Sequence, residues 1–209
     1  MTYDRNTTIG QFLDASAAKQ ATPGGGSVTA LVGALAASMG EMVVNYSVDK
    51  KGYEANRAEL TEALAELRRA RGMMLDLMVD DQTAYAALTA ARKAPQGSAG
   101  REETISAALL AAIRTPQAIA ATAAAVLALC DRLVEISNHY LLSDLAVSAD
   151  LAMATVRCAV YNVRVNLADV TDVAGRHSIE NEMGQVLAHA AVLIQRVSPR
   201  IWARHAEGR

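Results

Sequence analysis

The sequence predicts an all-α fold, a multihelical bundle with one long central helix, in a single domain over residues 1–209. Three observations support this prediction. Apolar residues recur at helical spacing, and no stretch alternates like a β-strand. Alanine is abundant while aromatic residues make up only 4% of the chain, which favours closely packed helices because alanine is small and the best helix former. Apolar residues account for 52% of the chain, enough to form a buried core.

The N-terminal half is expected to contain three helices. A capping box opens the first, because the side chains of Thr8 and Gln11 can each accept a hydrogen bond from the other's backbone N–H. The third is long, since its apolar residues follow a heptad seam between charged positions. The expected helices run from Thr7 or Thr8 to about Lys19, from the Thr22–Ser27 loop to about Val48, and from about Tyr53 to Ala91.

The C-terminal half is expected to contain four more helices after a loop marked by Pro95, Gly97 and Gly100. Pro116 is tolerated in the first turn of a helix, so a new helix is expected to start there. Ser143 is expected to cap the helix that follows it. The expected helices run from about Glu102 to Arg114, from Thr115 to about Ser137, from Asp144 to about Val170 and from about Ile179 to Ala206.

Charge and hydropathy restrict the partners and the compartment. The net charge is −2, so the chain lacks the basic excess that binding to nucleic acid or an anionic membrane requires. The N-terminus is polar, and the stretch from Gly25 to Met39 that comes closest to a membrane span is diluted by small residues. We therefore expect a cytoplasmic protein without a membrane span, in which Cys130 and Cys158 are buried free thiols.

The first feature that could carry chemistry is the loop Thr22-Pro23-Gly24-Gly25-Gly26-Ser27, which opens a helix. Free N–H groups and the positive end of the helix dipole would lie beside the loop, which is typical of an anion site. The alternative is a tight turn packed against a neighbouring helix. The loop is not a nucleotide P-loop, because it lacks the Lys-Ser/Thr ending and a preceding strand.

An acidic residue of the long helix is the second candidate. Asp81 lies on the apolar seam, seven residues after Met74 and seven before Leu88. A buried carboxylate needs a partner or a shifted pKa, and a shifted pKa would make Asp81 a candidate acid or base. The alternative is a structural salt bridge to another helix.

Two further groups of polar residues occur in the C-terminal half. The segment from Ser137 to Asp144 contains Asn138, although Ser143 and Asp144 also suit the start of a helix. Asn162 and Asn166 share one face of an otherwise apolar helix, and Asp169 continues that face. Asparagine is unfavourable within helices, so these side chains are expected to hydrogen-bond a ligand or a neighbouring helix.

The sequence contains no motif for a metal site or a serine hydrolase. The four histidines lack ligand spacing, and HExxH, CxxC and GxSxG are all absent. No metal and no redox cofactor is therefore expected.

Together these features resemble the family that includes methenyltetrahydrofolate cyclohydrolase and the cyclodeaminase domain of formiminotransferase-cyclodeaminase. The resemblance covers essentially the whole chain. The matching segments are FLDASAAKQATPGGGSVTALVGALAASM (Phe12 to Met39), NYSVDKKGY (Asn45 to Tyr53), DDQTAY (Asp80 to Tyr85), SNHYLLSDLAV (Ser137 to Val147) and YNVRVNLADVTD (Tyr161 to Asp172).

The resemblance implies a homodimer that binds a folate in a groove among its helices. It also implies roles for individual residues. Asp144 or Asp81 would act as the base and Lys50 would supply a cation or a proton. The residues expected to bind substrate are Pro23, Gly24, Gly25, Gly26, Ser27, Asn138, Asn162 and Asn166.

Three functions are compatible with the sequence. The first is hydrolysis of 5,10-methenyltetrahydrofolate to 10-formyltetrahydrofolate, and the second is cyclodeamination of formiminotetrahydrofolate with release of ammonia. The third is a folate-binding or dimerisation module without activity. The sequence shows no formiminotransferase domain beside the helical one, which favours hydrolysis of 5,10-methenyltetrahydrofolate.

Overall fold

The computed structural model describes residues 2–207, and this part of the chain is helical without β-strands. The all-α prediction is thus confirmed. The elements are α1 (Ile9–Ala17), α2 (Gly25–Asn45), the 3₁₀ helix η1 (Glu54–Asn56), α3 (Arg57–Lys93), α4 (Arg101–Ile136), the 3₁₀ helix η2 (His139–Leu141), α5 (Leu142–Leu167) and α6 (Val173–Glu207).

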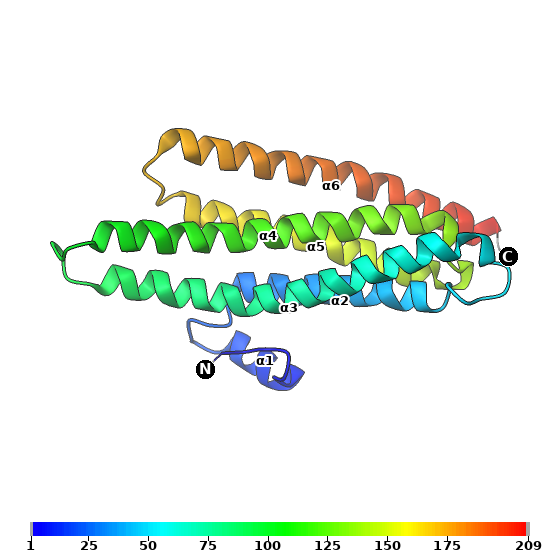
Figure 1. Cartoon of the computed structure of the whole chain (residues 1–209), viewed down its shortest axis with the longest axis horizontal. Coiled ribbons are helices and arrows are strands. Elements are labelled where there is room, and N and C mark those ends of the chain that lie inside the picture. The colour runs from blue at the N-terminus through cyan, green and yellow to red at the C-terminus, as the bar shows by residue number, and fades with distance from the viewer. Residues whose placement is uncertain (1, 208–209) are drawn as a thin grey trace.

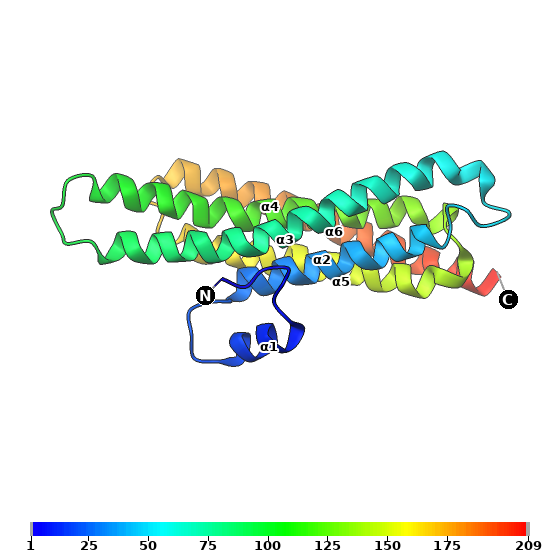
Figure 2. The same cartoon turned by 60° about the horizontal axis from the view of Figure 1, so that its bottom comes forward.

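Four long helices form an antiparallel, up-and-down bundle, as Figure 1 shows. Each of α2 to α5 packs on the next in sequence, and α2 closes the ring by packing on α5. Apolar side chains such as Leu67, Met74 and Leu127 are fully buried between them. The capping box at Thr8 and Gln11 is present, but α1 makes little contact with the long helices and stands apart from the bundle (Figure 2).

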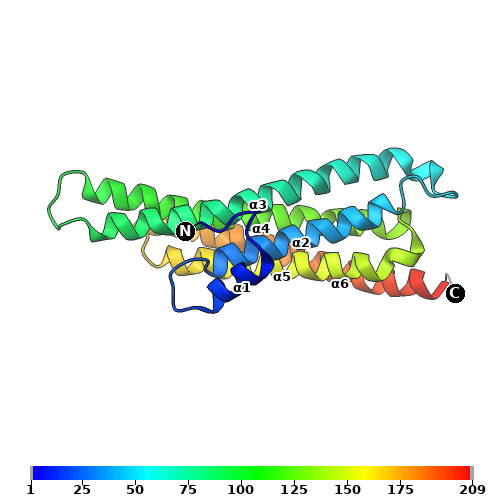
Figure 3. The same ribbon diagram turned by 90° about the horizontal axis from the view of Figure 1, so that it is seen from below.

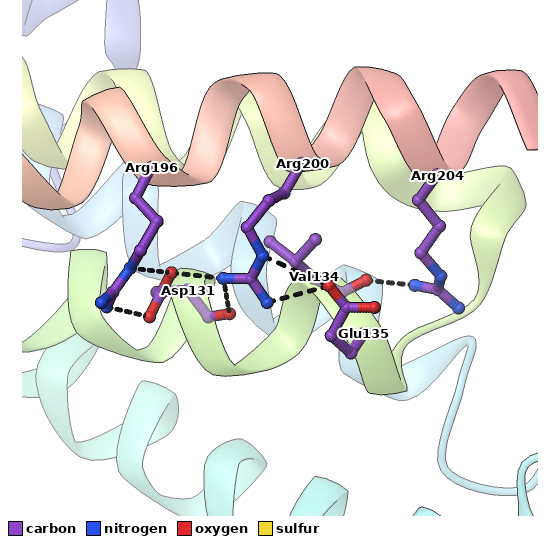
Figure 4. A network of polar contacts seen from close by, with 6 residues as sticks. All are labelled: Asp131, Val134, Glu135, Arg196, Arg200 and Arg204. Atoms are coloured by element: carbon purple, nitrogen blue, oxygen red, sulfur yellow. Dashed lines mark hydrogen bonds and ion pairs between the residues drawn. The ribbon is translucent and has the colours of Figure 1, made fainter.

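A ladder of arginines joins α6 to the outside of α4 (Figure 4). Asp131 bonds both Arg196 and Arg200, and its side chain is only 15% exposed. Arg200 also pairs with Glu135. Arg204 donates to two carbonyls at the C-terminal end of α4, where helical carbonyls lack partners within the helix. These bonds fix α6 against α4, and α6 also packs on α5.

The structure corrects the expected break before Pro116, because α4 is continuous from Arg101 to Ile136. A proline has no N–H, so Pro116 leaves the carbonyl of Ala112 without its helical donor. The side-chain amide of Asn166 on α5 supplies that bond, with 2.9 Å between Asn166 Nδ2 and the Ala112 carbonyl oxygen. A contact between two helices therefore compensates for the local cost of the proline.

The start of α5 also differs from the prediction. Ser143 was expected to cap this helix, but α5 begins at Leu142 and Ser143 lies inside its first turn. The chain enters α5 directly from η2, whose own cap is Asn138, with the side-chain oxygen accepting from the Tyr140 N–H at 3.2 Å. The serine is unnecessary as a cap because η2 already turns the chain into the helix.

One cysteine lies where the sequence predicted and the other does not. Cys130 is buried and free, which confirms the prediction for that residue. Cys158 is free but exposed, so the expectation that it is buried is wrong.

α2 has the length and hydropathy of a possible membrane span, and it is the one such helix among the described residues. More than half of that window, 56%, is buried inside the bundle. Burial of this kind is typical of the core helix of a bundle, which is what α2 forms.

The lengths of the helices create a gap at one end of the bundle. α2 has 21 residues, whereas α3 has 37 and α4 has 36. Because α2 begins partway along its neighbours, α3, α4 and α5 continue beyond its N-terminus. The glycine loop leads into α2 at this point.

Candidate active site

A pocket of about 220 Å³ lies where α2 begins, with walls from α3, α4 and α5. The apolar part of the wall is formed by Leu88, Ala112 and Pro116. Gly24, Gly25 and Gly26 line it with little more than backbone. The shorter length of α2 explains the pocket, since the space that a longer α2 would fill is left open between the other three helices.

Asp81 provides the charged group of this pocket. Its carboxylate accepts a hydrogen bond of 2.7 Å from the Ser27 hydroxyl, in the first turn of α2. A Cβ at Gly26 would overlap that carboxylate, so the absence of a side chain there lets Asp81 approach the helix end. Burial raises the pKa of Asp81 above its ordinary value, and the hydrogen bonds from the Ser27 side chain and backbone only partly offset this increase.

The two asparagines present acceptors to the pocket. Asn162 Nδ2 donates to the Cys158 carbonyl at 2.9 Å, and Asn166 Nδ2 donates to the Ala112 carbonyl at the same distance. With the amide nitrogens committed, the side-chain oxygens remain available to accept. A Cβ at Gly25 would lie 3.2 Å from the Asn162 oxygen, which shows how close the loop comes to this residue.

The pocket therefore suits a ligand with N–H donors or a positive charge. Its polar side chains include a carboxylate and two amide oxygens, and the lining contains no lysine or arginine. An anion would not fit, because Asp81 itself occupies the positive end of α2. Among residues 2–207, no three His, Cys, Asp or Glu side chains group as metal ligands.

Three other predicted residues lie at the opposite end of the bundle. Lys50 Nζ donates to Asn138 Oδ1 at 2.7 Å and lies 4.5 Å from the centre of the Tyr140 ring. Asp144 is in the first turn of α5. Asp144 and Asn162 are 18 residues apart on this helix, which corresponds to about 27 Å at 1.5 Å per residue. Within one chain, these residues cannot share a small pocket with Asp81.

The structure thus divides the predicted residues into two groups. Gly24, Gly25, Gly26, Asp81, Asn162 and Asn166 line the pocket, whereas Lys50, Asn138 and Asp144 lie at the far end. Pro23 and Ser27 are buried behind the loop, where Ser27 holds Asp81. Asp169, on the same face as the asparagines, pairs with Arg92. Tyr85 also lines the pocket but was not among the predicted site residues, although its position four residues after Asp81 places it on the same face of α3.

Comparison with known proteins identifies the family. The family model described as formiminotransferase-cyclodeaminase matches residues 8–185. The chain belongs to the formiminotransferase-cyclodeaminase family. A methenyltetrahydrofolate cyclohydrolase of Methylorubrum extorquens is 32% identical over 92% of this chain and 94% of that protein.

Two other members of this family are also similar. A solved structure of formiminotetrahydrofolate cyclodeaminase from Thermotoga maritima is 29% identical, with a TM-score of 0.88, and the match covers 95% of this chain and 97% of that one. The formimidoyltransferase-cyclodeaminase of Rattus norvegicus is 27% identical over 93% of this chain, which spans 38% of the length of the rat protein.

The close approach of Gly26 and Asp81 can be tested by substitution. Gly26→Ala should lower the free energy of unfolding by about 1–3 kcal/mol, because its Cβ would overlap the Asp81 carboxylate. In an Asp81→Ala background most of that cost should disappear. Gly184→Ala, a change into open space on α6, should instead raise stability by about 0.5–1 kcal/mol. Urea unfolding measures all four variants, and an equal cost of Gly26→Ala in both backgrounds would contradict the assignment.

The bond from Asn166 to the Ala112 carbonyl allows a second test. Asn166→Leu should cost about 1–2 kcal/mol, because it leaves that carbonyl unpaired beside Pro116. In a Pro116→Ala background, residue 116 has an N–H that can bond the Ala112 carbonyl. Asn166→Leu should then lower the free energy of unfolding by clearly less. A double-mutant cycle by thermal unfolding measures the coupling, and additive costs would show that Asn166 does not compensate for the proline.

Proposed function

We propose that the protein hydrolyses 5,10-methenyltetrahydrofolate to 10-formyltetrahydrofolate. The observation that carries this proposal is the Asp81 carboxylate in a partly buried pocket that presents acceptors and no cation. The methenyl carbon bridges N5 and N10 within an amidinium cation, and such a cation complements this pocket. The similarity to the Methylorubrum extorquens cyclohydrolase over nearly the full length of both chains supports the same reaction.

In this reaction Asp81 acts as the general base. Water attacks the methenyl carbon and gives a proton to the Asp81 carboxylate, which leaves a neutral carbinol between N5 and N10. Asp81 then returns the proton to N5 as the C–N5 bond breaks, while the carbinol O–H gives its proton to solvent and becomes the formyl group. One proton is released for each cation hydrolysed. Burial raises the pKa of Asp81 and so makes its carboxylate a stronger base.

The neighbouring groups position Asp81 and the substrate. Ser27 and the small Gly26 hold the carboxylate at the end of α2. The oxygens of Asn162 and Asn166 can accept from N–H groups of the pterin or from the attacking water. Leu88 and Pro116 form an apolar wall against which the folate could pack.

Cyclodeamination is the second candidate, favoured by the similarity to the Thermotoga maritima enzyme. Here N10 attacks the formimino carbon carried on N5, and ammonia leaves with protons delivered through Asp81. The product is 5,10-methenyltetrahydrofolate, and the same pocket would hold the cationic formimino group.

The proposal extends to partners and compartment. The one-carbon unit keeps its oxidation level in both reactions, so the proposed chemistry needs no redox cofactor, and water or the folate itself supplies the nucleophile. We further propose a homodimer that works in the cytoplasm and takes a reduced folate as its small-molecule partner.

The absorbance of methenyltetrahydrofolate in the near ultraviolet tests the proposed activity. The wild-type protein should bleach it faster than buffer alone, and Asp81→Asn should lower kcat by at least about 100-fold because the base is lost. Asp80→Asn, a change at the exposed neighbouring position, should retain wild-type activity. Ammonia release from formiminotetrahydrofolate identifies the second candidate instead. If the protein binds folate but catalyses neither reaction, both proposals fail and a non-catalytic module remains.

The raised pKa of Asp81 predicts two dependences on pH. The rate should rise with pH as Asp81 ionises, at a pH above the ordinary range of an aspartate. Burying the ionised carboxylate costs stability above the folded-state pKa, and this cost vanishes as pH falls and the group becomes protonated. Asp81→Asn should therefore melt at or above the wild-type temperature at pH 7, and its advantage should shrink towards pH 4. A lower melting temperature at pH 7 would show that the carboxylate is structural.

A further inference from the structure

The N-terminal segment, residues 2–8, is attached to α3 directly beside Asp81. Its anchor is the polar residue Gln82, which is only 4% exposed. The side-chain oxygen of Gln82 accepts from the Tyr3 N–H at 2.8 Å, and its side-chain nitrogen donates to the Tyr3 carbonyl at the same distance. One buried side-chain amide therefore pairs with both backbone groups of Tyr3.

The geometry of α3 gives these two neighbouring residues different tasks. Asp81 and Gln82 are consecutive, so their side chains point about 100° apart around the helix. Asp81 lines the pocket, whereas Gln82 meets the N-terminal segment. The segment has a second contact with α3, an ion pair of 2.6 Å between Arg5 and Asp76, but both side chains are more than half exposed. Because exposed ion pairs contribute little, Gln82 supplies most of the attachment.

Tyr3 connects this attachment to α1 and to the loop that follows α1. Its buried ring packs edge-to-face on Phe12, with 6.2 Å between the ring centroids. Its hydroxyl oxygen accepts from Gln20 Nε2 at 3.1 Å. The same nitrogen of Gln20 donates to the Ala15 carbonyl at 3.0 Å, at the end of α1. Tyr3 therefore joins α3, α1 and the loop after α1.

The loop held by Gln20 forms a wall of the candidate active site. Ala21 and Thr22 line the pocket directly after Gln20. In the part of the chain that the structure describes, neither these two residues nor Pro23 makes a hydrogen bond. The position of this wall is therefore set from its two ends, by the start of α2 and by Gln20.

The path of the chain shows why the end at Gln20 matters. The N-terminal segment crosses the bundle, the chain leaves the bundle as α1, and it returns through the loop to α2 (Figures 2 and 3). Because α1 makes little contact with the long helices, it cannot fix the loop by its own packing on the bundle. The connection through Tyr3 and Gln82 ties the loop to α3 instead.

We propose that Gln82 and Tyr3 are positioning residues, through which the N-terminal segment holds the wall of Ala21 and Thr22 in place for a bound folate. This inference rests on the proposed function. A loop that is free to move loses conformational entropy when a ligand packs on it, and this cost weakens binding unless the loop is already ordered. Asp81 is held separately, by Ser27. The segment therefore controls the affinity for folate and not the proton transfer.

The kinetics of Gln82→Leu separate this positioning role from a catalytic one. Leucine is similar in size but cannot bond Tyr3. With methenyltetrahydrofolate, KM should rise at least about 5-fold, while kcat stays within about 2-fold of wild type and keeps its dependence on pH. Thr83→Ala, an exposed change at the next residue of α3, should leave KM unchanged. A Gln82→Leu protein that melts earlier but keeps the wild-type KM would overturn the proposal.

Tyr3→Phe tests the link from the segment to the wall with a milder change. It keeps the ring that packs on Phe12 and removes the acceptor of the Gln20 hydrogen bond. The loss of this bond should raise KM about 3-fold. In a Gln20→Leu background, where the bond is already absent, Tyr3→Phe should not raise KM further. An equal rise in both backgrounds would show that the bond does not position the wall.

Trypsin tests the attachment without any folate. Lys19 is exposed in the loop after α1, directly before Gln20. In Gln82→Leu the loop should open more often, so cleavage after Lys19 should become at least about 10-fold faster. Cleavage after the exposed Lys51, at the far end of the bundle, is the internal reference and should not change. Mass spectrometry identifies each cut, and an unchanged rate after Lys19 would refute the attachment.

The two kinds of experiment distinguish this inference from the proposed function. If the wild-type protein acts on neither folate, the proposed function fails. The rate of cleavage after Lys19 still decides whether Gln82 holds the loop. If the wild-type protein is active and Gln82→Leu changes neither KM nor this cleavage, the positioning role alone is refuted.

Discussion

The arrangement of the site depends on one close contact, between the Asp81 carboxylate and the first turn of α2. Gly26 permits this contact because any side chain there would overlap the carboxylate, and Ser27 holds it with a hydrogen bond of 2.7 Å. The contact places a protein anion at the positive end of a helix, which is a favourable position for it. Asp81 therefore occupies the helix end at which an anion would otherwise bind, and a ligand entering the pocket would meet this carboxylate.

Much of the fold could be predicted from the sequence because it follows from periodicity and local capping. The long apolar seam through Met74 and Leu88 predicted α3, and the pairing of Thr8 with Gln11 predicted the start of α1. The errors occurred where distant contacts override local rules. A helix break at Pro116 was a reasonable expectation, but the sequence does not show that Asn166 would satisfy the carbonyl freed by the proline.

The site was only partly predictable for the same reason. Motifs indicated candidate polar residues and the apolar seam indicated Asp81, but neither shows how far apart these residues lie in the folded chain. Asp144 and Asn162 share one helix yet lie about 27 Å apart. Only the antiparallel packing of α2 and α5 shows that Asn162 lies at the same end of the bundle as the glycine loop, while Asp144 lies at the same end as Lys50. One small pocket within a single chain therefore cannot contain both groups.

A crystal structure with a bound stable reduced folate, such as 5-formyltetrahydrofolate, tests the account most directly. We predict that the one-carbon group lies within hydrogen-bonding distance of the Asp81 carboxylate, about 3 Å. A folate bound at the Lys50 end of the bundle, with no ligand atom near Asp81, would contradict the proposed function.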